Sequence, residues 1–189
     1  MARWDPDAPE RLASAALDLF AERGYENTTV IDIAQRAGLT KSTFFRHFPD
    51  KREVLFGGDT VATLTAAAIT AAPPEATPLE AVAHALETLG AQTFTPTRRE
   101  FSAKRWTVIA ATPELREREA LKGLGITAAM IKALTGRGVP ALTASVAAEL
   151  AALAWKIAYE RWHDPTSTAG FGELARQALT EVQAASALC

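Results

Sequence analysis

The chain of 189 residues is 48% hydrophobic and 22% charged, with a formal net charge of −2, so it has ample material for a globular core. No apolar run spans a membrane, and the polar N-terminus lacks the apolar centre of a signal peptide, so we expect a cytoplasmic protein with no membrane partner. The only cysteine, Cys189, can form neither an internal disulfide nor a cysteine-based metal site.

The distribution of charge is more informative than its sum. Between positions 36 and 52 the chain carries five basic residues and one acidic residue, which gives this segment a local net charge of +4. A focused positive patch on a nearly neutral protein favours a local DNA-binding face. The basic residues are Arg36, Lys41, Arg46, Lys51 and Arg52, with His47 in reserve.

Three short helices are predicted in the first fifty residues. Apolar residues recur every three to four positions over 8–23, and Gly24 can end this helix in the left-handed conformation. A second helix follows the capping residue Thr29 and ends at Gly38, and a third helix follows Thr40. A Pro-Asp pair then breaks the third helix.

A fourth helix is predicted from Lys51 to about Ala71. Gly57 and Gly58 lie early in it, and two interpretations are open: close packing against the first helix, or a flexible joint between two domains. The proline-rich stretch 72–78 is the clearest linker in the chain.

Four or five further helices are predicted after this linker, because apolar faces at helical spacing follow a series of prolines and no segment alternates as a strand does. The predicted fold class is therefore all-α, with about nine helices. An N-terminal three-helix head would be continuous with a helical bundle.

The second and third helices, joined by a tight turn at positions 37–39, form a helix-turn-helix. The recognition helix of this motif enters the DNA major groove, where hydroxyl and basic groups bond to base edges and an aromatic ring contacts a thymine methyl group. The side chains that remain outward on that helix are Lys41, Ser42, Thr43, Phe45 and Arg46.

Residues 11–55 contain a Gly-Tyr turn, a Thr-Thr pair before the second helix, an Ala-Gly turn, and the closing Phe-Pro-Asp-Lys sequence. In these features the segment resembles the TetR family of transcriptional regulators. At Phe45 the family usually has tyrosine, so only an apolar contact carries over. The Trp-rich penultimate helix also resembles regulators of the mycofactocin type. The resemblance implies base contacts by Lys41, Ser42, Phe45 and Arg46, and phosphate contacts by Thr29, Thr40, His47 and Lys51.

We therefore expect a DNA-binding domain at residues 1–68, with the helix-turn-helix at about 29–48, and a ligand-binding and dimerisation domain at residues 73–189. A small, largely apolar effector is expected to bind the second domain and release the protein from double-stranded operator DNA, as for a repressor. The same aromatic residues are also open to a plainer interpretation, as core and dimer packing. The predicted pocket residues are Phe101, Arg105, Trp106, Trp155 and Tyr159.

A homodimer is predicted to form through the last two helices, near 140–164 and 168–187, because their apolar stripes are broader than a lone surface helix needs. On this prediction a charge placed at Leu174 or Val182 gives monomers or insoluble protein.

No sequence signature indicates catalytic residues, a metal site or a cofactor, since the chain lacks a phosphate-cradling loop, metal-ligand spacing and a serine elbow. Two alternatives to a ligand-controlled regulator remain open. One is a helix-turn-helix DNA-binding protein that responds to no ligand, and the other is a helical enzyme or ligand carrier.

Overall fold

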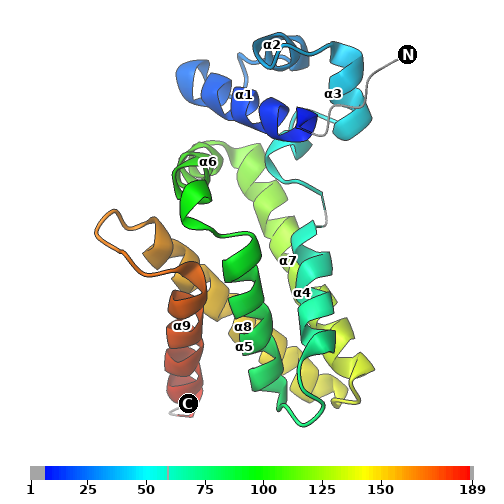
Figure 1. Cartoon of the computed structure of the whole chain (residues 1–189), viewed down its shortest axis with the longest axis vertical. Helices are drawn as coiled ribbons and strands as arrows, with labels where there is room; N and C mark the ends of the chain where they lie inside the picture. Colours follow the sequence, from blue (N-terminus) through cyan, green and yellow to red (C-terminus); the bar gives the residue numbers. More distant parts are fainter. Residues whose placement is uncertain (1–6, 59, 188–189) are drawn as a thin grey trace. The chain divides into compact units, whose positions relative to one another are not determined.

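The computed structural model describes residues 7–58 and 60–187, so Cys189 lies outside the described part of the chain. Within these residues the chain forms nine α-helices, two short 3-10 helices and no strand, which confirms the predicted all-α fold (Figure 1). The helices are α1 (Ala8–Arg23), α2 (Val30–Arg36), α3 (Lys41–His47), η1 (Glu53–Leu55), α4 (Thr60–Ala71), α5 (Pro78–Gln92), η2 (Pro96–Arg98), α6 (Arg99–Ala111), α7 (Pro113–Gly136), α8 (Ala141–His163) and α9 (Phe171–Ser186).

The chain divides into two compact units, and neither is a continuous stretch of sequence. The first unit comprises residues 1–58 and 101–120, and the second comprises residues 59–100 and 121–189. Helices α6 and α7 therefore contribute to both units. The division differs from the predicted domains, because the first unit ends at 58 rather than 68 and includes a later segment that the sequence pattern did not indicate.

Helices α1 to α3 of the first unit pack on one another, with α2 and α3 on the same side of α1 (Figure 1). The chain leaves α1 at Gly24, with a φ of 85°, and turns between α2 and α3 at Gly38, with a φ of 67°. Thr29 caps α2 in a capping box with Asp32, and Thr40 caps α3. The predicted helix-turn-helix is thereby confirmed.

The core of the first unit draws on helices far apart in the sequence. Val108 and Ile109 of α6 and Leu115 of α7 are buried in the same cluster as residues of α1 to α3. Because α2 and α3 have only seven residues each, they depend on this shared core rather than on their own helical stability. The aromatic members of the cluster are Phe20, Tyr25, Phe44, Phe48 and Phe56.

The predicted start of the fourth helix at Lys51 is wrong, because α4 begins at Thr60. The Asp50 carboxylate instead accepts hydrogen bonds from the backbone N–H groups of Arg52 and Glu53, at 2.8 and 3.1 Å. These bonds turn the chain into the 3-10 helix η1 directly after the recognition helix.

Gly57 and Gly58 follow η1, and both have a positive φ, 61° and 62°, which residues with a side chain rarely adopt. A Cβ atom at either position would have no neighbour within 4 Å, so the interpretation that these glycines allow close packing is wrong. The first segment of the first unit ends at this pair. The alternative interpretation, a flexible joint, stays a prediction.

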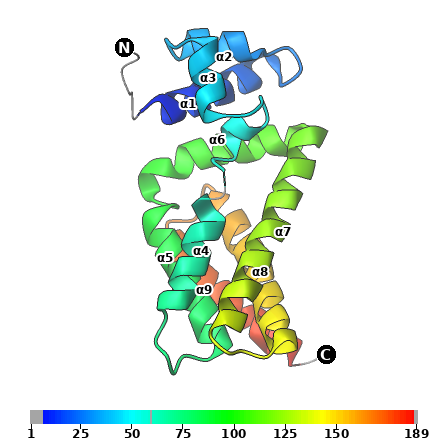
Figure 2. The ribbon, with the colours of Figure 1, turned by 90° about the vertical axis from the view of Figure 1, so that its right-hand side faces the viewer.

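In the second unit α5, α8 and α9 pack on one another, and α4 packs on α5 (Figure 2). A Cβ atom at Gly90 of α5 would lie 2.5 Å from the backbone nitrogen of Gly172 in α9, so these two helices approach backbone to backbone. Arg137 donates to the carbonyl oxygens of Ile69 and Ala72 and thereby ties the end of α7 to the end of α4. The buried face of α8 is largely alanine: Ala144, Ala147, Ala148, Ala151, Ala154 and Ala158.

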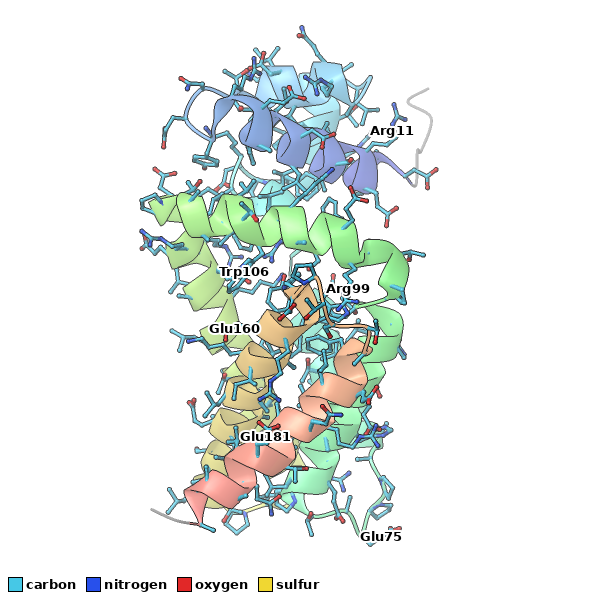
Figure 3. The ribbon with its side chains drawn as sticks, turned by 90° about the vertical axis from the view of Figure 1, so that its left-hand side faces the viewer. Arg11, Glu75, Arg99, Trp106, Glu160 and Glu181 are labelled. Carbon is cyan, nitrogen blue, oxygen red and sulfur yellow. The ribbon has the colours of Figure 1, made fainter. Side chains whose placement is uncertain are left out.

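The apolar stripe of α9 is used within the chain. Leu174 and Val182 are each only 7% exposed, while the outward side of α9 is polar. Figure 3 shows α9 packed across α8, and Glu181 of its outward side pairs with Arg161 of α8 at 2.6 Å. A charge at Leu174 or Val182 would therefore disrupt the core of the second unit and favour insoluble protein, and the dimer interface on α9 stays a prediction.

Two stretches, Glu53–Ala71 and Ala141–His163, are long and apolar enough to cross a membrane by length and composition alone, which is weak evidence. The first is not one helix, because the glycine pair interrupts it. The second is α8, which buries its alanine face against α5 and α9 and carries Glu149, Lys156 and Glu160 on its exposed side. This pattern is typical of a core helix.

Candidate nucleic-acid interface

The recognition helix α3 is held in place by its inward aromatic residues. The Phe44 side chain is fully buried, and Phe48 stacks near it with ring centroids 5.6 Å apart. The turn before α3 is fixed from α1, because the Arg11 guanidinium donates to the carbonyl oxygen of Ala37 and lies where a Cβ atom at Gly38 would be 3.1 Å away. These contacts fix the orientation of α3, and therefore the direction in which its outward side chains point.

The outward side of α3 carries four of the predicted DNA contacts. Phe45 is 47% exposed, which is unusual for a ring that could pack beside Phe44. The Lys41 ammonium lies 5.9 Å from the centroid of the Phe45 ring, one helical turn away. The structure therefore brings together, in one exposed set, Lys41, Ser42, Phe45 and Arg46.

The three predicted threonine contacts have hydroxyl groups that already cap the helices. The Thr29 hydroxyl donates to an Asp32 carboxylate oxygen at 2.6 Å and accepts from the backbone N–H of Asp32. The Thr40 hydroxyl accepts from the backbone N–H of Thr43 at 3.1 Å and shares a 2.9 Å hydrogen bond with the Thr43 hydroxyl. The hydroxyl groups predicted to contact DNA therefore also have a structural role as helix caps.

The basic patch is less available than its local net charge indicates. Arg36 forms a two-pronged ion pair with Glu22 of α1, at 2.9 and 2.8 Å, and Arg52 pairs with Asp50 at 3.1 Å. The Arg36 hydrogen bond holds the pKa of Glu22 below its usual value, so this pair is fully ionised at neutral pH. In the described part of the chain, neither Lys41 nor Arg46 is drawn into such a pair. Those two exposed cations are therefore available to DNA phosphates or base edges.

Two further predicted phosphate contacts are partly buried. The Lys51 ammonium donates to the carbonyl oxygen of Tyr25 at 2.8 Å and lies 3.9 Å from the centroid of the Tyr25 ring. An ammonium has three N–H donors, so two remain for other partners. The Nε2 atom of His47 is buried without a hydrogen-bond partner among the described residues.

The segment that follows the recognition helix is clamped from α6 and α7, which the sequence analysis missed. Arg105 of α6 donates to the carbonyl oxygen of Leu55 at 2.7 Å and pairs with Glu119 at 2.7 Å. Arg118 of α7 pairs with Glu53 of η1, and the guanidinium groups of both arginines lie within 5.3 Å of the Phe56 ring. No local pattern marks this clamp, because its partners are about fifty residues or more apart.

The five predicted pocket residues fall in different units. Phe101 packs against the aromatic core of the first unit, Arg105 is committed to the clamp, and Trp106 also belongs to that unit. Trp155 and Tyr159 of α8 belong to the second unit, where both contact the Phe94 ring. Trp155 and Tyr159 thus lie together within the second unit, and the other three lie on the part of α6 that belongs to the first.

A hollow of about 480 Å³ opens in the first unit, but it differs from the apolar pocket that we predicted. It contains basic and acidic side chains together. Burial, and next to it the Glu114 carboxylate, raise the pKa of the Tyr25 hydroxyl, so this group stays neutral in the hollow. Its lining residues are Tyr25, Asp50, Lys51, Arg52, Glu114 and Glu117.

Comparison with known proteins agrees with this geometry. Residues 12–56 match the family described as bacterial regulatory proteins, tetR family. The HTH-type transcriptional regulator TcmR of Streptomyces glaucescens is 49% identical over 45 residues, 24% of this chain and 20% of TcmR. The putative mycofactocin biosynthesis transcriptional regulator MftR of Mycobacterium tuberculosis is 35% identical over 49 residues, 26% of this chain and 25% of MftR. The similarity thus spans a quarter or less of these relatives.

The fold is shared over nearly the whole chain. SmeT, the repressor of a multidrug efflux pump of Stenotrophomonas maltophilia, was solved with triclosan and superposes with a TM-score of 0.62 at 20% identity, covering 94% of this chain and 90% of SmeT. Residues 12–56 thus match the N-terminal domain of this family, and the chain as a whole shares the fold of these solved regulators. These relatives are described as transcriptional regulators.

Proposed function

We propose that this chain regulates transcription by binding double-stranded operator DNA through the outward side of α3. The observation that carries the proposal is the contrast between neighbouring residues: Phe44 is fully buried, whereas Phe45 beside it is half-exposed between two cations that form no ion pair, Lys41 and Arg46. In this arrangement Lys41, Ser42 and Arg46 bond to base edges, and Phe45 contacts a thymine methyl group.

Phosphate contacts would fix the position of this helix on the duplex. Lys51, with two free N–H donors, and His47 are proposed for this task. Thr29 and Thr40 are proposed with them, although their hydroxyl groups also serve as helix caps. Thr43, hydrogen-bonded to Thr40, would add a contact at the groove edge.

The test compares a cation that forms no ion pair with one that does. We expect Lys41→Ala to change the preference at one base pair by roughly 1–3 kcal/mol, measured over single-base variants of an operator selected from genomic DNA. Arg36→Gln is the matched control, because Arg36 is already joined to Glu22, and we expect it to leave base preference unchanged. Equal weakening on all variants, or an equal effect of both substitutions, would contradict base reading by Lys41.

We also propose that the protein binds DNA as a homodimer, through the exposed side of α8. Leu142, Val146 and Leu153 of this side are 78%, 52% and 47% exposed, although α8 already buries its opposite side. Glu149 and Lys156 lie on the same exposed side, one helical turn to either side of Leu153. If two α8 helices pair antiparallel near Leu153, each Glu149 faces Lys156 of the other chain, as a twofold interface requires.

A charge exchange tests this interface. We expect Glu149→Lys to weaken the dimer, and the double variant with Lys156→Glu to restore it, when the mass is measured by sedimentation at several concentrations. Leu153→Glu should give folded monomers, whereas Leu174→Glu should unfold the second unit because Leu174 is buried. A dimer that survives Leu153→Glu unchanged places the interface elsewhere.

We propose, finally, that a small and largely apolar ligand binds the second unit and lowers operator affinity. The support is the aromatic cluster around Trp155 and Tyr159, together with the triclosan complex of SmeT, which has the same fold. Hydrophobic metabolites would be screened by tryptophan fluorescence, with Trp155→Phe as the control, and each hit tested on operator binding. A coupling of 1–3 kcal/mol would change affinity about 5–150-fold.

Two alternatives would emerge from the same screen. A protein whose operator affinity no ligand changes is a ligand-independent DNA-binding protein. Ligand binding without any salt-dependent affinity for DNA would instead favour a carrier or enzyme. Regulation of transcription also implies a cytoplasmic location, which fractionation of cells would check.

A further inference from the structure

Arg99, the first residue of α6, is the arginine of the second unit with an unmet hydrogen-bonding capacity. Its Nε donates to the carbonyl oxygen of Trp162 at 2.7 Å, and its guanidinium carbon lies 5.6 Å from the centroid of the Trp162 ring. Its Nη2 atom is buried and has no acceptor among the residues that the structure describes. Arg161 and Arg176 of the same unit, by contrast, are paired with carboxylates.

Asp164, whose pKa the charge of Arg99 lowers, does not satisfy this donor. Asp164 follows α8, and the positive charge of Arg99 is the weakest of several influences that lower its pKa. The Asp164 carboxylate instead accepts hydrogen bonds from the backbone N–H and the hydroxyl of Thr166, at 2.8 and 2.7 Å. A buried donor without a partner destabilises the folded state, and more so when it is charged. Binding of a ligand that supplies a hydrogen-bond acceptor to Arg99 would therefore lower the free energy.

Five aromatic rings form an apolar cluster that meets Arg99 at Trp162. The Phe94 ring stacks on Phe171 with centroids 4.3 Å apart and meets Trp155 and Trp162 edge-on at 5.2 and 5.6 Å. Tyr159 completes the set at 5.9 Å from Phe94. Trp162 and Phe171 are buried, whereas Phe94 and Trp155 are only partly buried, so the cluster has an accessible edge.

We infer that Arg99 and this aromatic cluster form a binding site for a ligand that joins a carboxylate to an apolar or aromatic body. A guanidinium binds a carboxylate through two parallel hydrogen bonds, and aromatic rings accommodate the apolar part. All six residues belong to the second unit, and Figure 3 shows Arg99 beside the end of α8. The site narrows the proposed effector from an apolar molecule to an apolar acid, and its regulatory role rests on the proposed function.

The probes are 3-phenylpropionate and its neutral amide, which share the apolar body and differ in charge. We expect the wild-type protein to bind the acid about tenfold or more tightly than the amide, measured by calorimetry and by quenching of tryptophan fluorescence. Arg99→Gln should abolish this difference and Arg99→Lys should retain part of it. Arg161→Gln, which removes an exposed and ion-paired arginine of the same unit, should leave it intact.

Equal affinity for the acid and the amide, a difference that survives Arg99→Gln, or no acid binding at about 10 mM would each overturn the site. Circular dichroism establishes that the variants are folded, and if Arg99→Gln unfolds, the reduced difference in Arg99→Lys still decides the question. Operator binding is measured separately. Acid binding without a change in operator affinity removes only the regulatory role, and failure to bind DNA removes the proposed function while leaving the site.

Discussion

The two units use their charged side chains in opposite ways. In the described part of the first unit, Arg23, Arg36, Arg52, Arg105 and Arg118 pair with carboxylates, whereas the exposed Lys41 and Arg46 of α3 do not. In the described part of the second unit, Arg161 and Arg176 form ion pairs, Arg137 binds carbonyl oxygens, and Arg99 keeps a buried N–H without an acceptor. Ion pairing in the first unit would thus set the proposed DNA-contacting cations apart, and incomplete pairing in the second supports the proposed ligand site.

The cores of the units differ as well. The first is held by aromatic rings that meet around short helices, whereas the second combines an aromatic cluster with small residues that let long helices approach closely. A core of aromatic rings loses little stability when an exposed neighbouring ring is removed, but much when a buried ring is removed. Backbone-to-backbone packing, in contrast, tolerates almost no added volume. The predictions below separate these two kinds of core, beginning with the largest effect.

The first prediction uses adjacent phenylalanines. Phe44→Ala should lower the free energy of unfolding by roughly 3–5 kcal/mol, because it removes a fully buried ring from the core. Phe45→Ala should change it by less than about 0.5 kcal/mol, because that ring is exposed, and should instead weaken operator binding. Denaturant unfolding and DNA titration measure both. Similar loss of stability in the two variants would show that Phe45 is a core residue.

The second prediction adds one methyl group in each of two helices of the second unit. Gly90→Ala should destabilise by about 1–3 kcal/mol or more, because the new Cβ would meet the Gly172 backbone at 2.5 Å. Gly123→Ala of α7, where a Cβ meets nothing within 4 Å, should stabilise by up to about 1 kcal/mol through helix propensity. Thermal unfolding distinguishes them. A neutral Gly90→Ala would mean that α5 and α9 can separate without cost.

The third prediction concerns Lys51, which donates a hydrogen bond to Tyr25 within the protein and is also a proposed phosphate contact. If it contacts phosphate, Lys51→Ala weakens binding to all sequences about equally and reduces the slope of log K against log salt by about 1. If its only role is the hydrogen bond to Tyr25, stability falls while the salt slope is unchanged. Filter binding over a range of salt concentrations decides between these roles.

The fourth and smallest effect is the response to acid. Hydrogen bonds from the Thr29 hydroxyl and backbone lower the pKa of Asp32 in the first unit, and bonds from Thr77 do the same for Glu80 in the second. A carboxyl whose pKa is lower in the folded state stabilises the protein above its unfolded pKa of about 4 and loses that contribution as pH falls through the folded pKa. Asp32→Asn and Glu80→Gln should each reduce the loss of stability between neutral and acidic pH, followed by unfolding at each pH.

The sequence predicted what local chemistry determines. The capping threonines, the turn glycine Gly38 and the inward pair Phe44 and Phe48 are all local signals, and they were enough to place the helix-turn-helix and its outward residues. The start of the fourth helix was missed because the Asp50 side chain competes for the backbone N–H groups that would begin a helix.

What could not be predicted depends on contacts between distant segments. A positive segment of +4 gave no indication that Arg36 would find Glu22 in α1, or that Lys51 would reach Tyr25. The broad apolar stripe of α9 was the same whether it faced its own bundle or another chain, so periodicity alone could not choose between core and interface. No sequence pattern singled out Arg99, because the buried N–H group without a partner becomes evident only in the folded structure.

The discontinuity of the first unit limits how this protein can be recombined. A fragment that ends at Gly58 would lack Val108, Ile109 and Leu115 and would leave the core around Phe56 uncovered. A functional chimera must therefore transfer two segments, 1–58 and 101–120, and join them to a foreign bundle at three points. Exchange of a single N-terminal block is poorly suited to giving such a regulator a new operator. Substitution of the few outward residues of α3 is the simpler way to change the operator that the protein binds.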